Sequence, residues 1–165
     1  MDKFIGKWAF PSDDSLMEQS ARRGMQYDFG KIAEDIIDKV HFEPDDVVLD
    51  LCCGNGALAK LISKTCQEIH GVDHSERLIG SAKKIKENEH LANLRLYFSD
   101  AMNIDKLFKE DFFDKSYCYF SFQYFNMHKR KLLLEKLSRV TTRKGWIFLG
   151  DIPDKTRMYN FYSSP

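Results

Sequence analysis

The sequence lacks the features that mark several broad classes of protein. It has no apolar run near the roughly 20 residues that a membrane-spanning helix needs. Its N-terminal segment, MDKFIGKW, lacks the apolar core of a secretory signal. It also lacks an excess of either charge, because 25 Lys and Arg residues balance 25 Asp and Glu residues. No overall field therefore attracts it to nucleic acid or anionic lipid. We expect a soluble, cytoplasmic protein without a membrane span or a nucleic-acid partner.

Cysteine is scarce, and its spacing suits neither a disulfide framework nor a zinc site. The four cysteines are Cys52, Cys53, Cys66 and Cys118, and none of them forms a C-x-x-C pair, which fits a reducing compartment. We interpret the adjacent Cys52 and Cys53 as small packing residues rather than a reactive pair. Cys118, on a predicted strand, is interpreted as a core residue. We expect no metal site.

The hydrophobic pattern predicts one α/β domain. Predicted strands cover residues 47–51, 68–73, 94–98, 113–121 and 146–151. Helices are predicted at 13–24, 29–40, 56–64 and 76–88, as a short turn or helix at 103–109, and through Leu132 to Val140, with Lys144-Gly145 as the stop of the last one. Ser75 is the expected N-cap of the helix at 76–88. Such alternation implies a parallel, doubly wound sheet, with ligands at the carboxyl ends of its strands.

The first predicted strand leads into a glycine turn, in the run VVLDLCCGNGALA at residues 47–59. Gly54 and Gly56 allow the backbone to approach a ligand closely, and the following helix points free N–H groups at the same place. The segment Gly54 to Ala59 also fits the dinucleotide fingerprint G-x-G-x-x-G/A. Asp73, near the end of the second strand, suits the ribose hydroxyls of any adenosine-type ligand. A nicotinamide dinucleotide and a different adenosine cofactor are both compatible with these residues.

Asp50 favours a cationic ligand over a dinucleotide. It stands immediately before the glycine turn, where a dinucleotide would place its pyrophosphate. A carboxylate near that group would be repelled by several kcal/mol at low effective dielectric, on the order of magnitude that Coulomb's law gives. S-adenosylmethionine carries a sulfonium and an ammonium group and no phosphate, so a carboxylate attracts it. An NAD-dependent oxidoreductase is the less favoured alternative.

The segment Asp50-Leu51-Cys52-Cys53-Gly54-Asn55-Gly56 resembles the first motif of class I S-adenosylmethionine-dependent methyltransferases, D/E-x-G-x-G-x-G, in its ubiquinone/menaquinone-type variant. It departs from the usual motif in having Cys52 where the first glycine is common, which costs backbone freedom at that position. The resemblance covers roughly residues 30–152. It implies a Rossmann-like sheet of strand order 3-2-1-4-5 with helices on both faces. The family adds two further strands after the fifth, whereas the pattern here stops at the fifth, and C-terminal truncation is one interpretation of that difference.

The resemblance also implies the cofactor-binding residues. Asp73 would hold the ribose hydroxyls, with His74 following it, and Asp100 would accept from the adenine amino group. Residues 1–28 are expected to form an arm that covers the cofactor, and residues 29–165 the S-adenosylmethionine-binding domain. The full predicted set is Asp50, Cys52, Gly54, Gly56, Asp73, His74, Asp100, Ala101, Ser121 at the floor of the site, and Tyr27 in the arm. No catalytic base is identified, because a surface histidine at a helix start is the preferred interpretation of His128.

The function implied is transfer of a methyl group from S-adenosylmethionine to a small-molecule acceptor by in-line displacement. A non-catalytic or degenerate partner subunit is the alternative from a different class. It is motivated by the fifth strand, Trp146 to Leu149, which would form an exposed sheet edge. Either that edge pairs in a homodimer, or residues 152–165 fold over it, or the chain is a fragment.

Overall fold

The computed structural model describes residues 28–152, so the predicted helix at 13–24 and Tyr27 lie outside the described residues. The helices are α1 (Phe29–Val40), α2 (Ala57–Ile62), α3 (Glu76–Asn88), α4 (Ile104–Leu107) and α5 (Met127–Val140). The strands are β1 (Val47–Leu51), β2 (Glu68–Asp73), β3 (Leu94–Phe98), β4 (Phe113–Tyr119) and β5 (Thr141–Gly150). Two short 3₁₀ turns, Ala101–Asn103 and Phe122–Tyr124, precede α4 and α5.

The five strands form one sheet of order β3-β2-β1-β4-β5, and every neighbouring pair runs parallel. The predicted Rossmann-like, doubly wound topology is therefore confirmed. The central strand β1 fixes the site, because Asp50 is in register with Gly71 of β2 on one side and with Tyr117 of β4 on the other. The carboxyl ends of β1, β2 and β4 consequently meet at one edge of the sheet.

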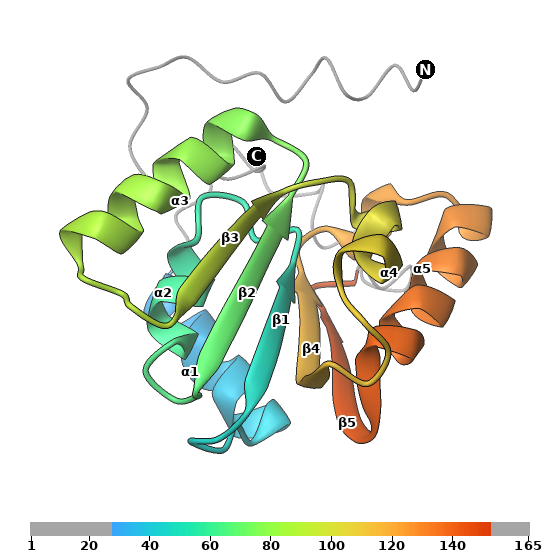
Figure 1. The fold of residues 1–165 in the computed structure, drawn as a ribbon, viewed down its shortest axis with the longest axis horizontal. Helices are drawn as coiled ribbons and strands as arrows, with labels where there is room; N and C mark the ends of the chain where they lie inside the picture. The colour runs from blue at the N-terminus through green and yellow to red at the C-terminus, as the bar shows by residue number, and fades with distance from the viewer. Residues whose placement is uncertain (1–27, 153–165) are drawn as a thin grey trace, which may run out of the picture.

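Helices cover both faces of the sheet (Figure 1), and each face carries its own hydrophobic cluster. Successive residues of a strand point to opposite faces. Leu49 of β1 accordingly packs in the cluster that contains Leu133 of α5. Its neighbour Val48 packs in the other cluster, which contains Ile36 of α1 and the fully buried Tyr117. The buried strands are apolar on both faces, as a parallel sheet requires.

The three longest helices begin at side-chain caps. Asp28 accepts from the N–H of Lys31 at the start of α1, and Asn126 accepts from Lys129 at the start of α5. Ser75 accepts from Leu78 at the start of α3, so the predicted N-cap is confirmed. Such caps satisfy N–H groups that have no partner within the helix and contribute about 1 kcal/mol each.

The start of β5 differs from the prediction. Helix α5 ends at Val140 and the chain enters β5 at once, so Lys144-Gly145 lies inside the strand rather than at the helix stop. Thr141 is in register with Phe113 but Trp146 with Lys115, which leaves an irregular segment between them. A Cβ atom at Gly145 would lie 2.3 Å from the carbonyl oxygen of Asp114. The glycine serves a close approach of two backbones.

Other bounds shift by smaller amounts. β4 ends at Tyr119 instead of residue 121, and α2 is shorter than the predicted 56–64.

Among the described residues β5 forms an edge of the sheet, and its Trp146 is 61% exposed. Within residues 28–152, none of the helices has the length and apolar character to cross a membrane.

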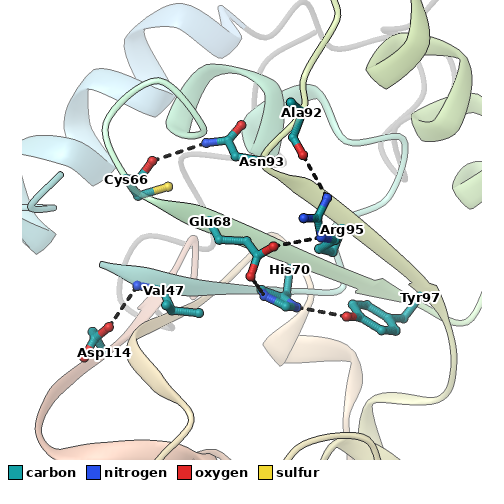
Figure 2. A network of polar contacts seen from close by, with 9 residues as sticks. All are labelled: Val47, Cys66, Glu68, His70, Ala92, Asn93, Arg95, Tyr97 and Asp114. Atoms are coloured by element: carbon teal, nitrogen blue, oxygen red, sulfur yellow. Dashed lines mark hydrogen bonds and ion pairs between the residues drawn. The ribbon is translucent and has the colours of Figure 1, made fainter. Parts of the chain in front are cut away.

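A polar network around the buried His70 joins β2 to β3 (Figure 2). His70, 4% exposed, places Nε2 at 3.0 Å from Oε2 of Glu68 and Nδ1 at 3.1 Å from the hydroxyl of Tyr97. The Nε atom of Arg95 lies 2.7 Å from the other oxygen of Glu68. The imidazole also packs against the rings of Phe108, Phe112 and Phe113. Burial lowers the pKa of His70, with Glu68 acting in the opposite direction.

Candidate functional site

The predicted site residues within the described part of the chain gather at the carboxyl ends of the strands. Because the strands are parallel, these ends lie along one edge of the sheet. β1 brings Asp50, Cys52, Gly54 and Gly56; β2 brings Asp73 and His74; the segment after β3 brings Asp100 and Ala101; the segment after β4 brings Ser121. Tyr27 lies outside the described residues.

The turn after β1 is built from left-handed backbone. Cys52, Gly54 and Gly56 have φ values of 63°, 57° and 78°. The left-handed conformation costs roughly 1–2 kcal/mol for a residue with a Cβ, and Cys52 adopts it where the family usually has glycine. Gly56 leads into α2, and a Cβ there would lie 3.1 Å from that of Ala82 in α3. The turn is thus held close against α3.

Asp73 binds this turn directly. One oxygen of its carboxylate accepts a hydrogen bond from the N–H of Gly54 across 2.9 Å, and the other accepts from the N–H of Ser75 across 2.8 Å. The side chain of Asp73 is buried, whereas the side chain of His74 is 56% exposed and places Nδ1 3.7 Å from Oδ1 of Asp73. Two backbone donors therefore fix the carboxylate, and its remaining lone pairs can accept from a ligand.

Asp50 is a buried carboxyl without a cationic neighbour among the described residues. It is 2% exposed, and its Oδ2 atom has no hydrogen-bond partner there. Burial raises the pKa of Asp50 to about 7, the charge of Asp73 adds to the rise, and the hydroxyl of Tyr117 opposes it. A buried carboxyl that is costly to ionise is the electrostatic arrangement that a bound cation would relieve.

The segment after β3 supplies a second acidic group. Asp100 is exposed, and its Oδ1 accepts from the N–H of Met102 across 2.8 Å, which orients the carboxyl. The N–H of Ser99 donates to the carbonyl oxygen of Asp73 across 2.9 Å and so joins the ends of β3 and β2. Ala101, in contrast, is buried in the core. Its side chain packs in the hydrophobic cluster on one face of the sheet.

The segment after β4 is held by side-chain contacts to its carbonyl groups. Gln123 donates from Nε2 to the carbonyl oxygen of Phe120 across 2.7 Å, and Arg130 donates to that of Gln123 across 2.6 Å. Ser121 is half-buried, and its carbonyl oxygen accepts from the N–H of Tyr124. His128 is exposed in the first turn of α5, as expected for a surface histidine. These contacts give the segment a defined conformation beside the turn.

The cysteines behave as packing residues. Cys53, Cys66 and Cys118 are buried, and Cys52 packs against the same cluster as Cys118. The pKa of the Cys52 thiol is raised by contact with Cys118 and by burial, and the pKa of Cys53 is raised mainly by burial. Among residues 28–152, no group of three or more His, Cys, Asp and Glu side chains is placed to hold a metal ion.

Tyr117 has a polar role that the sequence did not indicate. An aromatic residue on a buried strand indicates packing, yet the hydroxyl of Tyr117 lowers the pKa of the Asp50 carboxyl. Only the register between β1 and β4 brings the two side chains together. The alternation along β4 indicates which residues share a face, but it does not indicate their partners on β1.

Comparison with known proteins identifies the family of this chain. The sequence matches the family described as Methyltransferase domain over residues 48–145, which is more than half of the chain. The chain belongs to the methyltransferase domain family. The resemblance of its first motif to class I S-adenosylmethionine-dependent methyltransferases is thereby confirmed at the level of the family.

Individual relatives of the family match at lower coverage. A demethylmenaquinone methyltransferase from Geobacillus sp. (strain WCH70) is 28% identical over 142 residues, covering 80% of this chain and 58% of that protein. A probable cobalt-precorrin-6B C(15)-methyltransferase (decarboxylating) from Methanococcus vannielii is 33% identical over 73 residues, covering 44% of this chain and 41% of that protein. The chain spans about half the length of these two curated relatives.

Solved structures confirm the fold. The crystal structure of a putative S-adenosyl-L-methionine-dependent methyltransferase from Methanococcus maripaludis matches with a TM-score of 0.65 at 19% identity, over 81% of this chain and 64% of that chain. At this level of identity the likeness concerns the arrangement of strands and helices. It agrees with the sheet order described above.

Proposed function

We propose that this domain binds S-adenosylmethionine at the carboxyl edge of its sheet and transfers the methyl group to a small-molecule acceptor. The observation that carries the proposal is the combination of the left-handed turn with two buried carboxyls: Asp73, fixed by the N–H of Gly54, and Asp50, without a cationic partner among the described residues. The first suits ribose hydroxyl groups. The second suits a positive charge.

The residues divide the cofactor among the strand ends. Asp73 would accept from the ribose hydroxyls, and Asp100 from the adenine amino group. Asp50 would face the cationic methionine end. Backbone of the turn at Cys52, Gly54 and Gly56 would approach the ligand, His74 and Ala101 would flank its adenosine end, Ser121 would form the floor, and Tyr27 of the arm would cover the methionine end.

Charge argues against a dinucleotide in the same place. A pyrophosphate at the turn would lie beside the buried carboxyl of Asp50 and close to that of Asp73, in surroundings where repulsion is poorly screened. No described lysine, arginine or histidine forms an ion pair with Asp50 to offset it. A sulfonium and an ammonium group reverse the sign of the interaction.

Methyl transfer places modest demands on the protein. When bound, S-adenosylmethionine supplies a methyl carbon that is already activated for displacement. The chain's own residues would hold the donor, orient the acceptor in line and exclude water. Two relatives are named as a demethylmenaquinone methyltransferase and a probable cobalt-precorrin-6B C(15)-methyltransferase, and these names support a small-molecule acceptor.

Titration calorimetry tests the cofactor. The domain is expected to bind S-adenosylmethionine saturably and NAD weakly or not at all. Asp73→Ala should abolish or greatly weaken binding. Asp35→Ala, which removes an exposed carboxylate paired with Lys39 on α1, is the matched control and should bind normally. Tight binding of NAD with none of S-adenosylmethionine would refute the proposal.

The exposed edge strand favours a second candidate, a cofactor-binding partner subunit without activity of its own. Trp146 of β5 is 61% exposed, on a strand with one unpaired side among the described residues. Such a strand can pair with that of a second copy, giving a homodimer. Turnover against a panel of acceptors separates the two, because cofactor binding without turnover favours the second candidate. Measurement of mass in solution shows whether the edge pairs in a homodimer.

A further inference from the structure

Asp50 and Tyr117 form a buried polar pair in the centre of the sheet. They are register partners on the neighbouring strands β1 and β4, and they are 2% and 0% exposed. Tyr117 packs in the cluster with Val48, which lies two residues before Asp50 and so on the same face of β1. The hydroxyl and the carboxyl therefore share one side of the sheet, under the turn at 52–56.

Each residue of this pair has a buried polar atom without a hydrogen-bond partner among the described residues. Oδ2 of Asp50 and the hydroxyl oxygen of Tyr117 both lack a hydrogen-bond partner within residues 28–152. The two groups nevertheless act on each other, because the tyrosine lowers the pKa of Asp50 and the carboxyl contributes to raising that of Tyr117. A buried hydroxyl without a partner destabilises the folded chain, because it has lost its hydrogen bonds to water. Each group has the chemistry that the other lacks, because a hydroxyl can donate to a carboxylate oxygen.

The remaining titratable groups around Asp50 disfavour its ionised form. Asp73 at the end of β2 adds negative charge, and the thiol of Cys53 interacts with Asp50 from the turn. Among the described residues, Tyr117 is thus the one donor that acts in favour of the carboxylate.

On this face of the sheet, lysines of β4, α1 and α2 are held by other carboxylates, and Lys115 of β4, two residues before Tyr117, lies 2.7 Å from Oδ2 of Asp46. Lys39 of α1 is held 2.5 Å from Asp35, and Lys60 of α2 is held 2.5 Å from Glu89. Within residues 28–152, Asp50 therefore has no ion-pair partner, and a cationic ligand is one source of the charge that would neutralise its ionised form.

We propose that Tyr117 is a positioning residue for the cofactor: its hydroxyl donates to the ionised carboxylate of Asp50 and thereby sets the pH above which the site accepts a cationic ligand. The proposal rests on the proposed function only for the identity of that ligand. Below this pH the carboxyl is neutral and binding must first remove its proton. Above it the carboxylate is ready for a sulfonium or an ammonium group.

The test is a pH series of titration calorimetry with S-adenosylmethionine on the whole chain, for the natural protein and Tyr117→Phe. The variant keeps the ring that packs edge-on against Phe42 and loses only the hydroxyl. The midpoint of the pH dependence should move upward, with affinity at a pH below it falling about tenfold for each unit of displacement. At high pH the two affinities should converge. Their ratio at each pH cancels any titration of the ligand.

Two further variants make the result decisive. Asp50→Asn should remove the pH dependence, since a neutral amide has no proton to lose. Tyr97→Phe removes a hydroxyl from the opposite face of the sheet and should leave the midpoint unchanged. A loss of affinity in Tyr117→Phe that is equal at every pH, or an unmoved midpoint, would overturn the proposal, because a merely structural lesion acts at all pH values.

A ligand-free measurement separates this proposal from the proposed function. The carboxyl carbon of Asp50, followed by NMR through a pH titration, should change at higher pH in Tyr117→Phe than in the natural protein. If it does so while S-adenosylmethionine fails to bind, the pair stands and the proposed cofactor is wrong. If the carboxyl titrates identically in both proteins, the pair is refuted whatever the ligand.

Discussion

The N–H of Gly54 donates to Oδ2 of Asp73 across 2.9 Å, joining the turn after β1 to the end of β2. The residues stand 19 positions apart in the sequence, and the parallel pairing of β1 with β2 brings them together. The contact has two roles: it satisfies an N–H in a strained turn, and it fixes a carboxylate where a ribose would bind. Substitution of Asp73 therefore affects both the turn and the ligand.

Asp50 and Asp73 should respond differently to parts of the cofactor. Asp73→Asn should weaken binding of S-adenosylmethionine and of adenosine alike, because both ligands carry the ribose. Asp50→Asn should weaken S-adenosylmethionine by roughly tenfold or more, as expected for loss of a charge-assisted contact, and leave adenosine almost unaffected. Competition calorimetry with the two ligands measures this. Equal losses for both ligands in Asp50→Asn would contradict the assignment of Asp50 to the cationic end.

The thiols should be unreactive in the native protein. Burial raises the pKa of Cys66 to about 12, and the pKa values of Cys52 and Cys53 are raised as well. Since the thiolate is the reactive form, alkylation by iodoacetamide at pH 7.5 should be much slower than for a free thiol and become fast on unfolding. Mass spectrometry after timed labelling checks this. Rapid labelling of Cys52 in the folded chain would reject the interpretation of the cysteines as packing residues.

Ionisation of Asp50 should lower the stability of the folded chain as pH rises. Its pKa is about 7 in the folded chain against an ordinary 3.8, so between these values the folded chain binds more protons than the unfolded chain. The stability that this carboxyl contributes to the folded chain is fully present below pH 3.8 and is lost as pH rises through 7. Each unit of pKa corresponds to about 1.4 kcal/mol, giving a loss on the order of 4 kcal/mol at most.

Asp50→Asn removes this titration. Chemical denaturation should show that the variant gains free energy of unfolding relative to the natural protein as pH is raised from 4 to 8. Asp35→Asn, at an exposed position on α1, is the control and should run parallel to the natural protein. A variant that loses its relative stability with rising pH would contradict the raised pKa. The expected combination of higher stability with weaker cofactor binding is the trade-off seen where a buried charge serves a ligand.

Local signals in the sequence were sufficient for most of the elements. β1, β2, β3, α1 and α3 have the predicted bounds, because apolar periodicity and caps such as Ser75 are encoded within a few residues. The strand ends likewise placed the acidic residues at one edge, since parallel strands share their direction. The family resemblance added the strand order, which periodicity alone does not contain.

The features that were missed depend on distant partners. β5 begins at Thr141 rather than 146 because Thr141 pairs with Phe113, and no local pattern records that pairing. The contact of Asp50 with Tyr117 depends on the register between strands far apart in the chain. A shift of one residue in that register would turn the tyrosine to the other face. The sequence indicates that Tyr117 packs in a buried strand. Only the register of the sheet relates its hydroxyl to Asp50.

His70 should make the protein less stable in acid. Burial holds the pKa of this imidazole below its ordinary 6.5, so near and below that pH the unfolded chain binds more protons than the folded chain. Its contribution to stability is present above 6.5 and is lost as pH falls through the lowered value. Protonation would also give Nδ1 a hydrogen, which removes the acceptor for the hydroxyl of Tyr97.

His70 and Asp50 thus act with opposite signs over the same weakly acidic range, and a pH profile of the natural protein shows only their difference. In the Asp50→Asn background the acid-induced loss should stand out, with the free energy of unfolding falling as pH drops below 6.5. Adding His70→Phe, which keeps a ring among Phe108, Phe112 and Phe113, should flatten that fall. Adding the exposed His128→Gln should leave it unchanged. Denaturation curves at half-unit pH steps measure the slopes, and an equally steep fall with His70→Phe would show that a different group binds the proton.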